Sequence, residues 1–424
     1  MALEEYRNTM LGCTRCSYCK WIPFAQVKSW RFAKGCPSID YYGFHTYSGG
    51  GRLTTALSIL EGKTGYMDEA RDIFYKCQQC GACDVTCKVC LYNMDVIDTL
   101  REIRADLVEH GQELPQHKPL IANLRKENNM LMQPSAGRGK WSEGLGLKDL
   151  AKERAEVAFF AGCRCSFDEG MQHVARTAAS VLKQAGVDMG ILGDAEVCCG
   201  SRAYSLGYRQ DFDQVARINI EALAKAGVKT LVTPCSDCYW AFKRLYSDKA
   251  GATFEVLHTV ELIDRLIQQG TIRFGKSVPM TVTYHDPCHL GRQGEPYVPW
   301  NGVTTKAFGN ITKHVPPKPR YNGASGVYDA PRRILNAIPG LKLVEMERIR
   351  EYAWCCGAGA GVREAFPDFS SWTATERITE ATSTGAEALV TACPWCERNF
   401  IDAVAGDGQK MKVYDLVELV QRAI

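Results

Sequence analysis

Two adjacent cysteines followed by glycine occur twice in this chain, in EVCCGSR at 196–202 and in AWCCGAG at 353–359. A disulfide between neighbouring cysteines would close a strained ring, and one zinc ion does not easily use two side chains that point apart. A multi-iron cluster does so readily, because its different irons accept thiolates from different directions. The doubled triplet therefore indicates two iron–sulfur sites.

The cysteine content fits metal binding better than disulfide bonding. The chain has 20 cysteines in 424 residues, and its first residues, MALEEYRNTM, are acidic and lack the apolar segment of a secretory signal. Disulfide scaffolds of similar cysteine density are far shorter secreted chains. No apolar run approaches the ~18–20 residues of a spanning helix. We expect a cytoplasmic protein whose thiols bind metal, with any membrane contact made through a partner.

Length and charge set further bounds. An apolar fraction of 46% and a charged fraction of 23% are ordinary for a soluble protein, and the length suffices for two or three domains. The formal net charge is +3 and the basic residues are dispersed, so no nucleic-acid partner is expected. No flavin or nicotinamide fingerprint occurs, so electrons are expected to enter and leave through other redox subunits.

Residues 1–110 contain two cysteine-rich runs, CTRCSYC and CQQCGACDVTC, with a GCP triplet between them. The CxxCxxC spacing wraps three thiolates around one face of a [4Fe–4S] cube, and the fourth ligand comes from a distant position. Helical spacing at 55–62, 67–76 and 94–111 predicts that this block is a mainly α-helical, ferredoxin-like domain with two cubes.

In two-cluster ferredoxins the distal cysteine of each run binds the other cluster. By that logic one cube is bound by Cys13, Cys16, Cys19 and Cys87, and the other by Cys77, Cys80, Cys83 and Cys36. Pro37 gives Cys36 the usual cysteine–proline ending, whereas Cys87 lacks a following proline and Cys90 lies close behind it. Cys87 and Cys90 are alternatives, and we favour Cys87. Zinc sites and buried free thiols are the competing interpretations.

A repeat is visible from residue 154 onward when the cysteines are aligned. EVAFFAGC, EVCCG and KTLVTPCSDC in the first copy correspond to MTVTYHDPC, AWCCG and EALVTACPWC in the second. The CxxC motif follows the cysteine pair after 36 residues in one copy and 37 in the other, but the lone cysteine precedes the pair by 35 residues and by 67. The excess lies in a Pro- and Gly-rich insertion near 293–323, either a tolerated surface loop or a lid or docking loop.

Each copy supplies five cysteines, one more than a cube requires. The two sets are Cys163, Cys198, Cys199, Cys235, Cys238 and Cys288, Cys355, Cys356, Cys393, Cys396. Cys90 and Cys165 are left over. Cys165 is an alternative to Cys163, but the repeat alignment favours Cys163.

Apolar β-branched runs alternate with helical stretches, such as 169–186 and 213–227, through both copies. This order predicts α/β repeats with parallel sheets, in which ligands gather at the carboxyl ends of the strands. The expected organisation is a ferredoxin-like domain at 1–110, a linker at 111–153 with one helix near LIANLRKENN, and α/β domains at 154–275 and 276–424.

The motifs AGCRC, CCGSR, CSDC, YHDPCHLGR, CCGAGAGV and CPWC resemble those of the cysteine-rich CCG-domain iron–sulfur family, best known from heterodisulfide reductase catalytic subunits. The resemblance covers nearly the whole chain, and the fused N-terminal block resembles the single-chain form. It implies two Rossmann-like CCG domains, each binding a noncubane [4Fe–4S] cluster through one five-cysteine set. It also implies that a substrate disulfide lies between these clusters and receives electrons from the cubanes.

Two functions follow as hypotheses from this resemblance. The first is an oxidoreductase subunit acting on a small disulfide or thiol, in which His289, next to Cys288, is a possible proton donor; a packing role is the alternative for this histidine. The second is an electron-transfer subunit of a larger complex, beside flavoprotein, quinone, sulfite-reducing or aromatic acyl-CoA-reducing partners. A zinc-based scaffold is the third and contrasting hypothesis.

Overall fold

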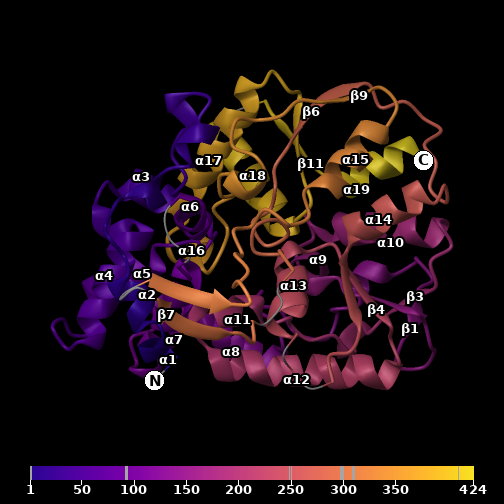
Figure 1. Cartoon of the computed structure of the whole chain (residues 1–424). Coiled ribbons are helices and arrows are strands. Elements are labelled where there is room, and N and C mark those ends of the chain that lie inside the picture. Colours follow the sequence, from indigo (N-terminus) through magenta and orange to yellow (C-terminus); the bar gives the residue numbers. More distant parts are fainter. Residues whose placement is uncertain are drawn as a thin grey trace.

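The computed structural model describes residues 2–90, 94–247, 249, 251–296, 300–307, 311–408 and 410–424. A helical N-terminal region, indigo and violet in Figure 1, lies beside two units that each contain a β-sheet. Within the described ranges, none of the helices has both the length and the apolar character that crossing a bilayer requires.

The N-terminal region is helical, as the sequence predicts. Its helices are α1 (Ala2–Glu5), α2 (Arg7–Leu11), α3 (Pro37–Tyr42), α4 (Gly49–Leu60), α5 (Asp68–Tyr75), α6 (Ala82–Cys90) and α7 (Val96–Glu109). The spacing of Leu100, Ile103 and Leu107 places them on one face of α7, and all three are buried. Helix α7 packs against α4 and α5, so it holds the region together.

The first α/β unit has a five-stranded sheet in the order β1-β3-β2-β4-β5, and every pair is parallel. The strands are β1 (Lys148–Asp149), β2 (Val157–Phe159), β3 (Met189–Ile191), β4 (Thr230–Thr233) and β5 (Glu255–His258). The helices are α9 (Gly162–Phe167), α10 (Gln172–Gln184), α11 (Ser201–Leu206), α12 (Arg209–Ala226), α13 (Ser236–Trp240) and α14 (Thr259–Gln268).

The second α/β unit has a four-stranded parallel sheet in the order β11-β10-β6-β9. Its strands are β6 (Met280–Tyr284), β9 (Leu341–Leu343), β10 (Ala388–Thr391) and β11 (Lys412–Asp415), and its helices are α15 (Asp329–Ala337), α16 (Val362–Ala365), α17 (Pro367–Ser383), α18 (Pro394–Asp407) and α19 (Leu416–Ala423). The insertion forms an antiparallel hairpin of β7 (Val303–Ala307) and β8 (Ile311–Val315).

The two sheets repeat one topology, since β3-β2-β4-β5 of the first matches β9-β6-β10-β11 of the second. The predicted α/β class with a helical ferredoxin-like region is therefore confirmed. The units also pack reciprocally: α14 of the first lies on α15 of the second, and α19 of the second lies on α10 of the first. Buried side chains from both sheets form one continuous apolar core.

The segment between the helical region and the first unit does more than connect them. It contains α8 (Lys118–Glu127), the helix expected near LIANLRKENN, and then supplies edge strand β1 to the first sheet. It also carries Arg138, which is 1% exposed and reaches a cysteine of the first unit.

Candidate iron–sulfur sites

The N-terminal cysteines line two separate cavities. One is lined by Cys13, Cys16, Cys19 and Cys87. The other is lined by Cys36, Cys77, Cys80 and Cys83. These groups are the two exchanged sets that the spacing predicts, brought together by the fold. The side chain of Cys90 lies outside the described residues, so the choice between Cys87 and Cys90 stays a prediction.

Both cavities meet the amino-terminal end of α4, where the sequence reads GGG. The backbone N–H of Gly50 donates to Cys19 Sγ at 3.4 Å, and a Cβ at Gly50 would lie 3.2 Å from Cys13 Sγ. A Cβ at Gly49 would lie 3.0 Å from the Cβ of Cys83 on the other side. Side chains there would fill space beside the sulfurs, and the helix end favours an anionic group. Four thiols around an open cavity therefore fit an iron–sulfur cluster.

The first five-cysteine set forms a connected group of thiols near the carboxyl ends of β2 and β4. Hydrogen bonds link Cys163 to Cys198, Cys198 to Cys199, Cys199 to Cys238, and Cys238 to Cys235. All five side chains are buried. Iron and sulfide would ligate all five sulfurs, because the different irons of a cluster accept thiolates from different directions. The set fits a cluster with more thiolate ligands than a cube takes.

Protons must leave these thiols before metal binds. The hydrogen bond to Cys198, followed by burial, raises the pKa of Cys163 well above its usual range. Hydrogen bonds from Cys198 and Cys238 instead lower the pKa of Cys199 to about 6. Because thiolate is the binding form, cluster assembly at this site is expected to release protons.

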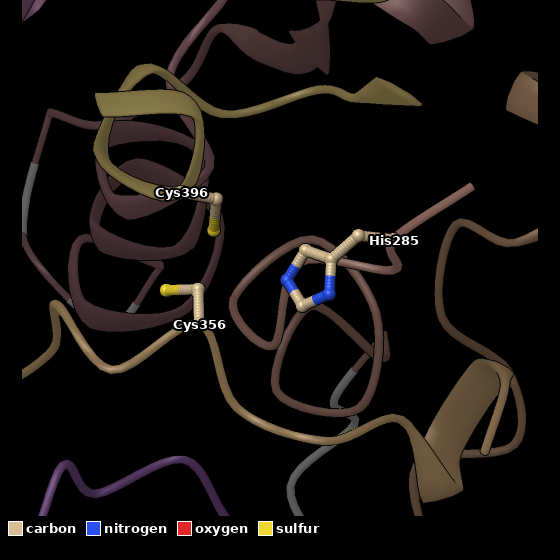
Figure 2. Close-up of side chains that lie close together, drawn as sticks. All are labelled: His285, Cys356 and Cys396. Carbon is tan, nitrogen blue, oxygen red and sulfur yellow. The ribbon is translucent and has the colours of Figure 1, made fainter. Parts of the chain in front are cut away.

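The second set has the same arrangement. Cys356 is hydrogen-bonded to Cys355 and Cys396, and Cys396 to Cys393. Cys288 interacts electrostatically with Cys356. His285, which the sequence analysis missed, joins this set: one ring nitrogen and the sulfurs of Cys356 and Cys396 lie within 4.8 Å of one another (Figure 2).

His285 follows strand β6 directly, and Figure 2 shows its ring to the right of Cys356 and Cys396. Its Nδ1 accepts a hydrogen bond from Arg377 Nε at 3.1 Å, so the neutral ring carries its proton on Nε2. Burial lowers the pKa of His285 and favours that neutral form. In the repeat alignment the residue that matches His285 is Phe160. This replacement of an apolar residue by a histidine is the sequence signal that could have identified His285.

The glycine of each CCG triplet is explained by its backbone. Gly200 and Gly357 have φ values of +77° and +92°, and their N–H groups donate to Cys198 Sγ at 3.4 Å and Cys355 Sγ at 3.3 Å. A Cβ at Gly357 would lie 2.4 Å from the carbonyl oxygen of Ser370. Only glycine fits both the left-handed conformation and the space, so the triplet turns two thiols and an N–H toward one site.

Two sulfur–sulfur contacts join the sets. The thiol of Cys80 in the N-terminal region is hydrogen-bonded to Cys355 of the second unit. Cys235 of the first unit is hydrogen-bonded to Cys393 of the second. These contacts place the Cys36 set, the Cys288 set and the Cys163 set in that order, and the Cys13 set meets the Cys36 set at Gly49 and Gly50 of α4.

Arg138 and Glu196 support the first five-cysteine set, and neither was predicted from the sequence. Arg138 Nη2 lies 3.3 Å from Cys163 Sγ, and its Nη1 donates to Glu196 Oε1 at 2.8 Å. Glu196 also accepts the backbone N–H groups of Ala161 and Gly162. A guanidinium beside a cysteine ligand stabilises negative charge on the sulfur.

Replacing Arg138 with methionine is expected to destabilise the protein by about 3–5 kcal/mol, because Glu196 would lose its partner while buried. Thermal unfolding of the anaerobically purified variant measures the loss. The double variant Arg138→Met/Glu196→Gln should recover more than half of it, because the unpaired charge is gone. Equal melting temperatures for the wild type and the single variant would contradict this expectation.

His289 lies between the two five-cysteine sets. Its Nδ1 is 2.6 Å from the carboxylate of Asp237, which lies between Cys235 and Cys238, and its ring stacks on Trp240 at a centroid distance of 4.5 Å. The contact with the carboxylate fixes Nδ1–H as a donor and leaves Nε2 as the nitrogen that can exchange a proton. The structure thus brings this predicted residue to the junction of the sets.

The base of the insertion docks on the N-terminal region. Arg292 Nε donates to the carbonyl of Cys80 at 2.6 Å, and Gln293 Nε2 donates to the carbonyl of Gln79 at 2.9 Å. Further along, Trp300 lines a pocket of about 250 Å³ together with Trp240 and Arg292. Residues 297–299 and 308–310 of the insertion lie outside the described ranges.

Comparison with known proteins agrees with this architecture. A family model described as a cysteine-rich domain, CCG, matches residues 157–243 and 282–401, and a 4Fe-4S dicluster domain model matches residues 9–91. The fold and the cysteine sites thus define an iron–sulfur protein with a dicluster region and two CCG domains.

The chain is 32% identical to a subunit of dihydromethanophenazine:CoB–CoM heterodisulfide reductase from Methanosarcina mazei, over 97% of this chain and 93% of the relative. It is 27% identical to EtfAB:quinone oxidoreductase of Syntrophomonas wolfei, over 83% of this chain and 47% of that protein. It is 30% identical to the probable iron-sulfur-binding oxidoreductase FadF of Bacillus subtilis, over 82% and 46%. The chain belongs to the family of heterodisulfide-reductase-like iron–sulfur oxidoreductase subunits.

Proposed function

We propose that the chain binds four iron–sulfur clusters and works with other redox subunits to reduce or form a small disulfide. The Cys13 and Cys36 sets would hold cubane [4Fe–4S] clusters, and the Cys163 and Cys288 sets noncubane ones. The proposed units are residues 1–110, 154–275 and 276–424, with 111–153 between the first two. When bound, such clusters supply one-electron carriers.

The observation that supports this proposal is the pair of thiol contacts between sets. The contacts of Cys80 with Cys355 and of Cys235 with Cys393 support a series of three sets, which the shared end of α4 extends to the Cys13 set. Cys16 of the Cys13 set is exposed, so this set is the end of the series that lies nearest to solvent. The two five-cysteine sets abut at the other end, where a disulfide could place one sulfur against each.

The proposal is tested by mixing the reduced, anaerobically purified protein with small disulfides and their thiols. We expect new or shifted paramagnetic signals from the CCG clusters and turnover with a viologen donor. No spectral change and no turnover with any disulfide would contradict the disulfide reaction. Metal analysis of the same sample tests the zinc hypothesis, because a protein that holds zinc in place of iron would have no electron carriers.

We propose His289 as the proton donor to a thiolate leaving this junction. Asp237 orients the ring through Nδ1, and stacking on Trp240 fixes its plane, so Nε2 is the atom that would give up the proton. Reduction of a disulfide to two thiols consumes two electrons and two protons. A buried junction needs a side chain to deliver those protons, because bulk water is excluded.

The variant His289→Asn should lower disulfide turnover by about 100-fold or more, the usual size of a general-acid contribution. It should also remove one limb of the pH–rate profile, which simple loss of packing would not do. Iron content should stay unchanged. Turnover with an unaltered pH profile would assign His289 to packing instead.

A second function, electron transfer without a disulfide substrate, has its own support. Relatives of similar identity include a protein named EtfAB:quinone oxidoreductase, and most cysteines of both five-cysteine sets are buried. In that case the chain would pass electrons to or from a flavoprotein or further iron–sulfur subunits. Co-purification from the native source would identify these subunits, and a partner carrying its own substrate site would favour this function.

A further inference from the structure

A second group of potential metal ligands lies between the two α/β units, behind Cys396. His173 on α10 of the first unit faces Glu397 on α18 and Glu418 on α19 of the second. His173 Nε2 lies 3.2 Å from Glu397 Oε1 and 3.5 Å from Glu418 Oε1. One nitrogen and two carboxylate oxygens therefore fall within 4.8 Å of one another. Figure 1 shows α10 and α19, which pack together, at the right of the molecule.

This group contains buried oxygens that lack hydrogen bonds. Glu397 is 1% exposed and its Oε2 has no hydrogen-bond partner among the described residues. Asp415, 2% exposed, is electrostatically coupled to Glu397, Glu418 and His173, and its Oδ2 likewise has no partner in the described part of the chain. Each of the two carboxylates thus keeps one buried oxygen without a donor, which is costly, so the arrangement favours a bound cation.

The second oxygen of Asp415, and the same Glu418 Oε1 that faces His173, also take part in ending β11 and starting α19. Asp415 Oδ1 accepts the N–H of Val417 at 3.0 Å, and Glu418 Oε1 accepts the N–H of Asp415 at 3.0 Å. This capping box fixes both side chains at the helix start. The carboxylates are thus held in place before any ion binds, as a metal site requires.

The first unit shows what the same position looks like without this group. There α14 begins with the matching capping box, formed by His258 and Glu261. The residue that matches Glu397 is Tyr239, which is hydrogen-bonded to Glu261 and lies against the His258 ring. Lys243 adds a positive charge beside Glu261.

In the second unit the residue matching Lys243 is Ile401, and the counterpart of Arg265, Arg422, lies over the ring of Tyr414. Three carboxylates therefore replace a tyrosine, a histidine and a glutamate, and the nearby lysine is lost. Two of these differences, Glu397 for Tyr239 and Asp415 for His258, add a carboxylate at the place where His173 from the other unit completes the group.

We propose that His173, Glu397 and Glu418 bind a divalent first-row cation, with Asp415 beside them, and that this ion joins α10 of the first unit to α18 and α19 of the second. An imidazole nitrogen with carboxylate oxygens suits Mn²⁺, Fe²⁺ or Zn²⁺. The site is separate from the cysteine sets and independent of the proposed reaction. His173 and Glu418 are partly exposed, which leaves the ion a route to solvent.

Equilibrium dialysis of the cluster-loaded protein against Mn²⁺ tests the site, because Mn²⁺ prefers oxygen and nitrogen donors to thiolates. The wild type should bind about one Mn²⁺ per chain, and the ion should raise its melting temperature. Glu418→Gln and His173→Gln should each weaken Mn²⁺ binding at least about tenfold. Failure of the wild type to bind Mn²⁺ would overturn the proposal and leave a His–Glu ion pair only.

The matched control is Glu261→Gln, which alters the equivalent capping box of the first unit. It should keep its Mn²⁺, and equal loss from this variant would also overturn the site. Iron content reports whether each variant is intact. If Glu418→Gln loses iron, the result is decided by His173→Gln, because the side chain of His173 lies on a partly exposed helix face. Undiminished Mn²⁺ binding by an intact His173→Gln variant contradicts the proposal.

Discussion

Replacing Cys199 with alanine should remove one of the four proposed clusters, so the iron content should fall from about 16 to about 12 atoms per chain if each cluster holds four irons. Cys199 is the centre of the first five-cysteine set, hydrogen-bonded to both Cys198 and Cys238. Disulfide turnover should fall to background, because the substrate would have a cluster on one side only. Iron and sulfide analysis, with low-temperature magnetic spectra, measures the loss.

Cys165 is the matched control for this experiment. It lies two residues after Cys163 on α9 and is fully buried, but in the repeat alignment Cys163, not Cys165, matches the lone Cys288 of the second copy. Cys165→Ala should therefore keep all of its iron, whereas Cys163→Ala should lose a cluster. The reverse result would exchange the two residues in the ligand set.

The double variant Cys36→Ala/Cys77→Ala should cut the connection between the exposed end of the protein and the CCG sites. Its two residues belong to the set that lies between the Cys13 set and the second unit, where Cys80 meets Cys355. With a protein donor such as reduced flavodoxin, too large to reach buried sites, the first cubane should still be reduced. The CCG clusters should stay oxidised on the timescale of wild-type reduction, as followed by rapid-freeze spectroscopy.

Cys165→Ala again provides the control, because it changes a buried thiol without touching this set. Reduction of the CCG clusters at the wild-type rate in the double variant would show that electrons enter elsewhere. The series order inferred from the thiol contacts would then be wrong.

Much of the architecture could be predicted from local patterns. The repeated intervals between CCG and CxxC aligned the two halves, and apolar runs before Cys163 and Cys235 placed strands where β2 and β4 occur. The exchanged N-terminal sets followed from spacing, and the fold gathers each set around its own cavity. These features depend on residues close in sequence or on a repeat that can be counted.

The supporting residues could not be predicted, because they depend on long-range packing. Arg138 comes from what reads as a Pro- and Gly-rich linker, yet it reaches Cys163 and Glu196 from 25 and 58 positions away. His285 becomes visible only as the replacement for Phe160 in the repeat. The contact between Cys235 and Cys393 depends on how the two sheets are placed relative to each other. The residue spacing within either half gives no information about that placement.

The reciprocal packing of α14 on α15 and of α10 on α19 has a consequence for how such a chain could arise and how it folds. Each half ends in a helix that packs on a helix following the lone cysteine of the other, the pattern that two identical protomers make across a two-fold axis. A duplicated gene whose products already paired would give this arrangement once the copies were joined end to end. Either half alone would expose apolar surface that the other half covers. A fragment that ends near residue 275 should therefore expose the apolar side of α10 and aggregate instead of remaining a monomer.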